Sequence, residues 1–202
     1  MAKRVFLFWG LTCVILLSGI VQADASSILL EFSGSIVKKI NGKRYQAQIY
    51  CKGSLLRLEY QYAIRTERGF SSIEIVRPDD AEVWYLLAQQ KELLVIPLEA
   101  DDVLPTRPEL PGERDRILVG ESSVAGRQAK LYEIQSDHGG RRERFYEWVD
   151  AEAEIVLKLV SRDRDWSFEY ERIRLSRQPA YYFDAPPGYT RREVSGNGRR
   201  KG

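Results

Sequence analysis

Apolar and polar residues alternate with a period of two along much of this chain. In residues 44–51 every second residue is apolar, and residues 56–62 repeat the pattern. Alternation of this kind predicts β-strands that bury one face and leave the other in water. Asn41-Gly42 stands between residues 28–39 and 44–51 and favours a type I′ hairpin turn, because both residues tolerate positive φ.

A second group of predicted strands is apolar on both faces. These strands cover residues 71–76, 82–88 and 93–98. In the middle one, Trp84 and Leu86 point away from the face that carries Tyr85. Arg77-Pro78-Asp79-Asp80 is typical of a turn, so the strands form an antiparallel meander. Antiparallel sheets usually leave one face in water, so we expect something to cover the second face here.

Residues 99–126 interrupt the alternation. Prolines and glycines cluster between Pro105 and Gly112, which predicts a long connection with a short helix at 113–118. A long connection inside a compact domain is either a lid or binding element, or a plain crossover, and both interpretations stay open.

Strands resume after this connection. They are predicted at residues 128–134, 144–149, 155–160 and 166–175. The pattern therefore predicts a mainly β protein of about ten or eleven strands with very little helix. No internal repeat is evident. The terminal stretch TRREVSGNGRRKG is glycine-rich and basic, and we expect residues 191–202 to be a disordered tail.

The N-terminus has the layout of a secretory signal peptide. Lys3 and Arg4 precede an apolar run, and Ala23-Asp24-Ala25 provides a small-x-small cleavage site. The apolar run is also long enough for a signal anchor. We expect cleaved export to the periplasm, with residues 1–25 as the signal peptide and 26–190 as one domain.

The composition of the mature chain argues against a nucleic-acid-binding protein and against an internal disulfide. Removal of Lys3, Arg4 and Asp24 from the 31 basic and 29 acidic residues leaves 29 and 28, a net charge of +1. A nucleic-acid-binding protein would carry a basic excess. Cys51 is the single cysteine left, so no internal disulfide forms, and we expect it to fill space in a strand.

No constellation of residues indicates catalysis. The single histidine, His138, lies in a glycine-rich turn, and no metal-ligand spacing surrounds it. Gly120-Glu121-Ser122-Ser123-Val124 matches a nucleophile elbow only loosely, because its last position is not glycine. Asp79-Asp80 and Asp101-Asp102 are paired carboxylates in predicted turns, where aspartate bonds local backbone. We therefore predict no catalytic residues, no metal and no cofactor.

Basic residues cluster at Gly126-Arg127 and at Arg141-Arg142-Glu143-Arg144. Solvated strand ends explain them, and contact with anionic lipid headgroups is the alternative.

Several short sequence motifs resemble those of a known family. They are IVRPDD followed by VWYL, then GESSVAGRQAKLYEI, FYEWVDAEAEIVLKLV and FDAPPGYTR. Over residues 28–191 the chain resembles the periplasmic lipoprotein-localisation carrier (LolA/LolB-like) superfamily, and more closely its outer-membrane lipoprotein-sorting-like relatives in Gram-negative bacteria. Its carriers begin with an amphipathic helix, whereas residues 28–39 here predict a strand. No equivalent of their lid arginine is identified.

The resemblance implies a single, strongly curved antiparallel half-barrel whose concave face holds acyl chains. The leading hypothesis is therefore an exported, non-catalytic protein that binds a lipid, an acyl chain or a lipoprotein. An envelope-sensing or protein-interaction module on the same fold is the alternative, and an enzyme is a third class. The partners expected are lipid or lipoprotein acyl chains, an envelope protein and peripheral membrane contacts, with no nucleic acid. The candidate cavity residues are Tyr60, Trp84, Leu86, Trp148, Trp166, Phe168 and Tyr170.

Overall fold

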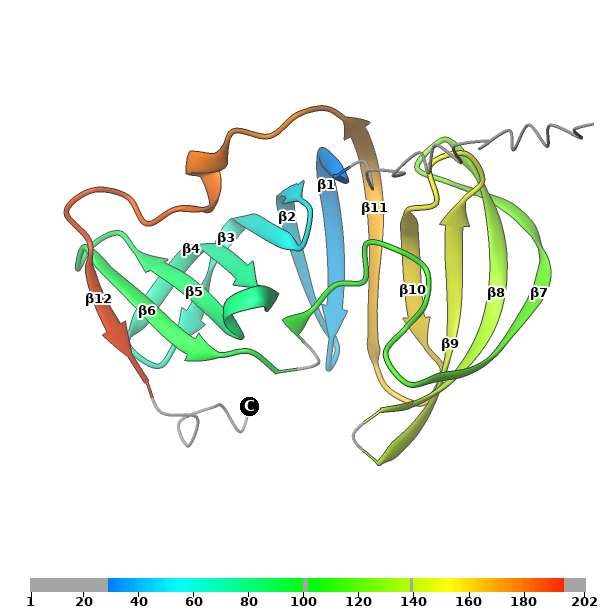
Figure 1. The fold of residues 1–202 in the computed structure, drawn as a ribbon. Coiled ribbons are helices and arrows are strands. Elements are labelled where there is room, and N and C mark those ends of the chain that lie inside the picture. Colours follow the sequence, from blue (N-terminus) through cyan, green and yellow to red (C-terminus); the bar gives the residue numbers. More distant parts are fainter. Residues whose placement is uncertain (1–28, 100–101, 139, 195–202) are drawn as a thin grey trace, which may run out of the picture.

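The computed structural model describes residues 29–99, 102–138 and 140–194, and they form one sheet of twelve strands (Figure 1). The predicted signal peptide, residues 1–25, and the end of the predicted tail, 195–202, lie outside the described residues. The strands are β1 (Glu31–Ile40), β2 (Lys43–Lys52), β3 (Leu55–Thr66), β4 (Gly69–Arg77), β5 (Glu82–Leu87), β6 (Glu92–Pro97), β7 (Glu113–Val124), β8 (Arg127–His138), β9 (Arg141–Asp150), β10 (Val156–Ser161), β11 (Trp166–Leu175) and β12 (Thr190–Glu193).

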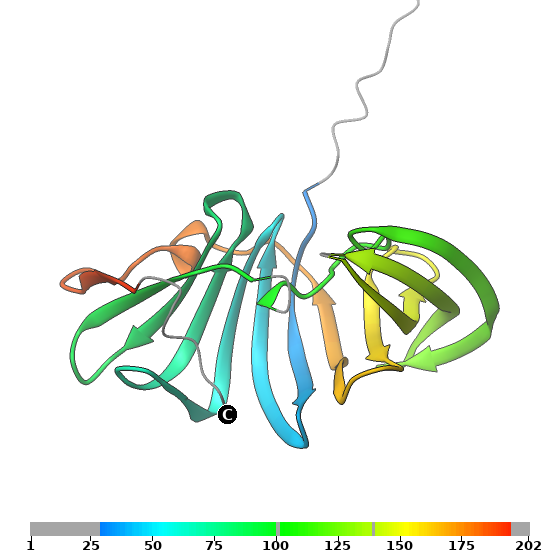
Figure 2. The same ribbon diagram turned by 90° about the horizontal axis from the view of Figure 1, so that it is seen from below.

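Two antiparallel meanders meet in the middle of this sheet. β1 to β6 lie side by side in chain order, as do β7 to β11, and β11 pairs with β1. β12 then returns to pair in parallel with β6. The sheet is open and curls most strongly over β7 to β11 (Figure 2). The predicted mainly β, curved, half-barrel fold is confirmed.

Three predictions about local structure need correction. The short helix expected at 113–118 is the first half of strand β7, whose bounds are Glu113–Val124. The connection is therefore shorter than expected and ends at residue 112. Residues 191–193, assigned to the disordered tail, belong to β12. The count is twelve strands, because β7 and β12 were not recognised as strands.

The turns follow the chemistry of their residues. Asn41 and Gly42 have φ of +50° and +74°, as a type I′ turn requires, and they join β1 to β2. Pro78–Asp80 form η1, a short 3₁₀ helix between β4 and β5. Gly34 on β1 allows a close approach, because a Cβ there would lie 2.2 Å from the carbonyl oxygen of Arg172.

The larger core lies on the inner, concave face of the sheet. Phe32, Ile49 and Leu58 from the first meander pack there with residues of β8 to β11. Leu104 and Leu110 join them, so residues 102–112, in the connection between the two meanders, cover part of the inner face. Cys51 is buried in this core, and burial raises the pKa of its thiol to about 12, so it fills space as predicted.

A second core lies on the outer face of β4 to β6. It consists of Ile75, Trp84, Leu86, Leu93, Val95 and Phe183. Phe183 comes from η3 (Ala180–Phe183), in the C-terminal segment that runs from β11 back to β12 (Figure 1). The two apolar faces predicted for these strands are thus both covered by the chain itself.

Candidate functional site

Two of the motifs that were considered for catalysis, Asp79-Asp80 and residues 120–124, lie in well-defined elements of the fold. Asp79 and Asp80 lie in the predicted turn, as part of η1. Their partners are side chains and not the local backbone that we expected: Asp79 accepts a hydrogen bond from Ser54 Oγ at 2.8 Å, and Asp80 pairs with Arg77 at 2.7 Å. Gly120 to Val124 lie inside strand β7, not at a strand-to-helix turn. Within the described ranges, no three residues of His, Cys, Asp or Glu gather closely enough to hold a metal ion.

The structure divides the candidate cavity residues between the two cores. Tyr60, Trp166, Phe168 and Tyr170 lie in the inner core. Trp84 and Leu86 lie in the outer core, so Tyr85 is the neighbour that faces inward. Trp148 is half-buried, with Lys158 Nζ 5.0 Å from its ring centroid. The seven residues therefore do not form one wall, and their binding of a ligand stays a prediction.

The inner aromatic residues pack against one another. Trp166, Phe168 and Tyr170 follow each other along β11 with ring centroids 6.0 and 5.7 Å apart in edge-to-face contacts. The Tyr60 hydroxyl donates to Glu74 Oε2 at 2.6 Å. Burial, together with the nearby charge of Glu74, raises the pKa of Tyr60 well above its usual range, so this hydroxyl stays a hydrogen-bond donor.

Trp84 on the outer face is held by polar neighbours. Its Nε1 donates to Glu82 at 2.7 Å, and the guanidinium of Arg77 lies 4.3 Å from its ring centroid. Arg191 of β12 lies 5.7 Å from the same ring. Cation–π contacts of this kind stabilise the ring in place. The contact with Trp84 thus adds to the backbone pairing with β6 that holds β12 to the sheet.

Strand β7 combines two features in the described part of the chain: exposed apolar side chains and a backbone edge that pairs with no other strand. β7 is the outermost strand, hydrogen-bonded only to β8 (Figure 1). Ile117, Leu118 and Val119 are 55%, 56% and 53% exposed. An edge strand presents a row of N–H and C=O groups that another strand can pair with. We name residues Ile117 to Val119 on this edge the β7 edge patch.

Ion pairs hold β7 to the rest of the sheet. Arg116 Nη1 lies 2.6 Å from Glu147 Oε2 on β9, and its Nε lies 2.7 Å from Glu113 Oε1. Burial raises the pKa of Glu147, and the guanidinium of Arg116 offsets only part of that rise. Beyond the turn that ends β7, Arg127, the first residue of β8, pairs with the buried Asp150 on β9. Arg116 therefore ties the strand that carries the patch to β9, and Arg127 ties the neighbouring strand.

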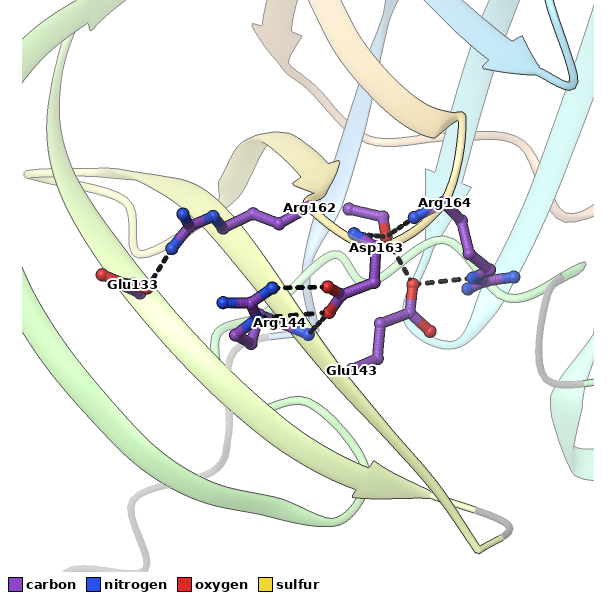
Figure 3. Close-up of polar contacts among 7 residues, drawn as sticks. Glu133, Glu143, Arg144, Arg162, Asp163 and Arg164 are labelled. Atoms are coloured by element: carbon purple, nitrogen blue, oxygen red, sulfur yellow. Dashed lines mark hydrogen bonds and ion pairs between the residues drawn. The ribbon is translucent and has the colours of Figure 1, made fainter.

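Two of the four arginines in the predicted basic clusters, Arg127 and Arg144, have acidic partners. Figure 3 shows Arg144 on Asp163, with Nη2 and Oδ1 2.7 Å apart, and Arg164 on Glu143, with Nε and Oε1 2.7 Å apart. Arg162 pairs with Glu133 in the same cluster. These contacts fasten the turn after β10 to β8 and β9. Ion pairs within the chain thus neutralise Arg127 in the cluster at 126–127 and Arg144 in the cluster at 141–144.

The sequence prediction missed the β7 edge patch because prolines and glycines at 105–112 hid the strand that follows them. Ile117-Leu118-Val119 is a β-prone triplet flanked by charged residues, and that signal could have indicated a strand. Its exposure could not be derived, since nothing in the sequence shows that β7 ends the sheet.

Comparison with known proteins gives a likeness in fold. The MucA/MucB complex of Pseudomonas aeruginosa matches at 22% identity over 74% of this chain and 53% of that chain, with a TM-score of 0.47. MucB in complex with MucA(peri) matches at 20% over 78% and 55%, with a TM-score of 0.49. A DUF1329 family protein of Desulfovibrio piger matches at 12% over 78% and 91%, with a TM-score of 0.29.

The chain spans about half the length of the MucB chains that it matches. At these identities and TM-scores the likeness says nothing about the function of this chain. No family model matches the chain, and no curated protein matches its sequence. Within the described residues, the structure contains no helix that is long and apolar enough to span a membrane.

Proposed function

We propose that this protein is an exported, non-catalytic envelope protein that binds an extended segment of another protein as an added strand on the free edge of β7. The observation that carries the proposal is the β7 edge patch, three consecutive apolar residues that are each more than half exposed on an unpaired edge. Strand addition uses main-chain hydrogen bonds for affinity and side-chain contacts for specificity.

The patch also indicates the chemistry of its partner. An apolar stretch of the added strand would cover Ile117 to Val119 and remove them from water, at roughly 25 cal/mol per Å² of apolar surface. Glu121 is exposed and makes no ion pair within the described chain, which favours a basic residue opposite it. The proposed partner is therefore an apolar β-prone segment with a basic flank. The signal-peptide pattern of residues 1–25 supports placing both partners in the periplasm.

Site-specific photo-crosslinking in the intact envelope tests this proposal. A benzophenone amino acid replaces Val119, and a matched control replaces Tyr62, which is 78% exposed on β3 inside the sheet. We expect one discrete crosslinked protein from position 119 and none from position 62. The crosslinked segment, made as a peptide, should then slow backbone hydrogen exchange in β7 of the purified protein.

Other outcomes would contradict the proposal. A crosslink at the mass of two copies of this chain would assign the edge to self-association. A peptide that binds without protecting the amides of β7 would show that binding does not use the edge.

Binding of an apolar ligand, such as a lipid or a lipoprotein acyl chain, is a second candidate function. It is favoured by the aromatic inner face, which is partly covered by Leu104 and Leu110 of a connection without strands of its own. If that connection moved aside, an acyl chain would gain about 0.8 kcal/mol for each methylene that it buries. A role in outer-membrane lipoprotein sorting would follow from such binding.

Mass spectrometry of lipids extracted from the purified protein tests this second candidate. Co-purified acyl chains, and a shift of tryptophan fluorescence when fatty acid is added, would support it. A clean extract with unchanged fluorescence would remove it, and would leave the proposal for the β7 edge intact.

A further inference from the structure

A pocket of about 450 Å³ lies over the three central strands, where the two meanders meet. It is separate from the β7 edge patch. Its lining residues include Ser33, Ser35, Gln48, Tyr50, Arg172 and Arg174.

Strand pairing places these six side chains on one face in two rows. Ser33 on β1 lies between Tyr50 on β2 and Arg174 on β11. Ser35 lies in the same way between Gln48 and Arg172. Residues that pair across neighbouring strands project to the same side of a sheet. The face is the outer one, since the alternating residues of β1 and β2 lie in the inner core.

The hydroxyl of Ser35 is an unusual feature of this pocket. Ser35 is 5% exposed, and its Oγ is buried without a hydrogen-bond partner in the described chain. Leaving a buried polar group unsatisfied costs about 1–3 kcal/mol, so native proteins rarely retain one. A ligand with an acceptor oxygen in the pocket would satisfy this donor.

The two arginines supply uncompensated positive charge. Arg172 and Arg174 are exposed, and neither makes an ion pair within the described residues. The carboxylates on the neighbouring strands already have cationic partners. Glu171 pairs with Arg44, Glu169 with Lys158, and Glu31 with Lys52, at 3.3, 2.7 and 3.0 Å.

The backbone fixes the spacing of the pocket. The pairing of β1 with β11 shifts register between Ser35 and Ile36, which is the signature of a bulge. Just before it, Gly34 lets the two strands approach closely, since a Cβ would lie 2.2 Å from the carbonyl oxygen of Arg172. Bulges re-aim side chains and recur next to functional sites.

We propose that this arginine pocket binds a phosphate group. Arg172 and Arg174 would bond its oxygens through their planar guanidinium forks, which fit phosphate in a bidentate way. Ser35 Oγ would donate to a third oxygen, and the Tyr50 hydroxyl and Gln48 amide complete the donor set on the opposite wall. The phosphate comes either from a soluble phosphoryl compound or from the headgroup of an anionic lipid.

Titration of residues 26–202 with inorganic phosphate, followed by ¹H–¹⁵N NMR, is the first test. We expect saturable shifts of the amides of residues 33–35, 48–50 and 172–174. The double variant Arg172→Gln/Arg174→Gln should weaken binding by about tenfold or more, because each charged hydrogen bond contributes about 1.5–3 kcal/mol. Arg172→Lys/Arg174→Lys keeps the charge but removes the forks, and should also weaken binding.

A matched control separates phosphate binding in the pocket from general attraction to positive surface charge. Arg65→Gln/Arg141→Gln removes two other exposed arginines, and should leave phosphate binding unchanged. Ser35→Ala should weaken binding several-fold and leave the fold intact, which circular dichroism checks. Equal loss in the control pair, or shifts that do not saturate, would overturn the proposal.

Vesicles distinguish the two sources of phosphate. Binding to phosphatidylglycerol vesicles that the Arg172→Gln/Arg174→Gln variant loses, and that phosphatidylcholine vesicles do not show, would assign the pocket to a lipid headgroup. Saturable binding of inorganic phosphate without vesicle binding would assign it to a soluble compound. Failure of both probes to bind would reject the site.

Discussion

The two edges of the sheet, β12 and β7, differ in length, polarity and cover. β12 has four residues, all exposed, and three of them are charged. Arg191 pairs with Glu82 at 2.5 Å, and Arg192 with Glu92 at 3.4 Å. β7 has twelve residues, and the exposed apolar triplet Ile117–Val119 lies in its middle.

The fold protects the edge at β12 and leaves the edge at β7 open. Short edge strands with charged side chains discourage pairing with other chains, and β12 has both devices. A long edge with exposed apolar residues is an aggregation liability unless it has a partner. That contrast is the physical basis for proposing β7, and not β12, as the binding edge.

The comparison depends on both edges being firmly anchored, and the largest expected effect concerns the anchor of β12. Phe183, in the segment that leads to β12, is 1% exposed and packs into the outer core on β4 to β6. Phe183→Ala should lower the free energy of unfolding by about 3–5 kcal/mol, measured by urea denaturation. Tyr181→Ala, which removes a ring that is 69% exposed in the same turn, should cost less than about 1 kcal/mol. Equal losses would show that Phe183 is not the anchor.

The strand next to β7 is anchored where their hairpin turns, by the pair of Arg127, the first residue of β8, with Asp150 on β9. Asp150 also accepts hydrogen bonds from the backbone N–H groups of Glu152 and Ala153, at 3.0 and 2.7 Å. Burial acts to raise the pKa of Asp150, but these bonds and the Arg127 guanidinium outweigh it, so the net pKa lies below the ordinary value of 3.8. Asp150→Asn should therefore cost about 2 kcal/mol at neutral pH.

The sign of the pH dependence follows from that lowered pKa. The stabilisation by Asp150 is fully present above pH 3.8 and is lost as the pH falls through the folded-state pKa. The difference in stability between wild type and Asp150→Asn should shrink below that pH in urea denaturation. Glu147 has a raised pKa, so its contribution to the free energy of unfolding falls as the pH rises. Because Glu147 is present in both wild type and Asp150→Asn, this contribution largely cancels in the difference between them. A difference that stays constant down to pH 2 would contradict this account.

Arg191 tests how much the charges of β12 protect its edge. Arg191→Ala removes the pair with Glu82 and the contact with the Trp84 ring. Because both side chains of the pair are partly exposed to solvent, we expect a loss of about 0.2–1 kcal/mol that decreases at high salt. Light scattering should show more self-association than in the wild type. Unchanged scattering would mean that the short length of β12 protects this edge without its charges.

The smallest effect on stability is expected at β7 itself. Leu118→Lys places a charge on a side chain that is 56% exposed, so the free energy of unfolding should change by less than about 0.5 kcal/mol. The crosslink from position 119 should nevertheless disappear, because an edge lysine opposes strand pairing. Tyr62→Lys is the control and should leave the crosslink in place. A crosslink that survives Leu118→Lys would argue against strand addition.

The period-two pattern predicted most of the sheet, because alternation between faces is a local property of strands. It located β1 to β6 and β8 to β11, and the Asn41-Gly42 turn. It failed at β7, where the flanking prolines dominated, and at β12, whose four charged or polar residues carry no apolar signal. The pattern also predicted that both faces of β4 to β6 are covered.

The candidate sites were less accessible to sequence. Alternation predicted that Trp84 and Tyr85 lie on opposite faces, but only the structure shows that Trp84 lies in the outer core and Tyr85 packs against the inner core. The arginine pocket combines residues of β1 and β2 with residues of β11 that lie more than a hundred positions later in the chain. No local pattern in the sequence connects Ser35 with Arg172.

The amino-acid sequence thus specifies ten of the twelve strands, all except β7 and β12, and which of their side chains share a face. Those features depend on neighbours in the chain, through backbone geometry and turn chemistry. What covers the second apolar face, which strands end the sheet, and which arginines of the described residues remain unpaired became visible in the folded structure. These depend on pairing between distant strands, because the order of strands in a sheet is set by long-range packing and not by local preference.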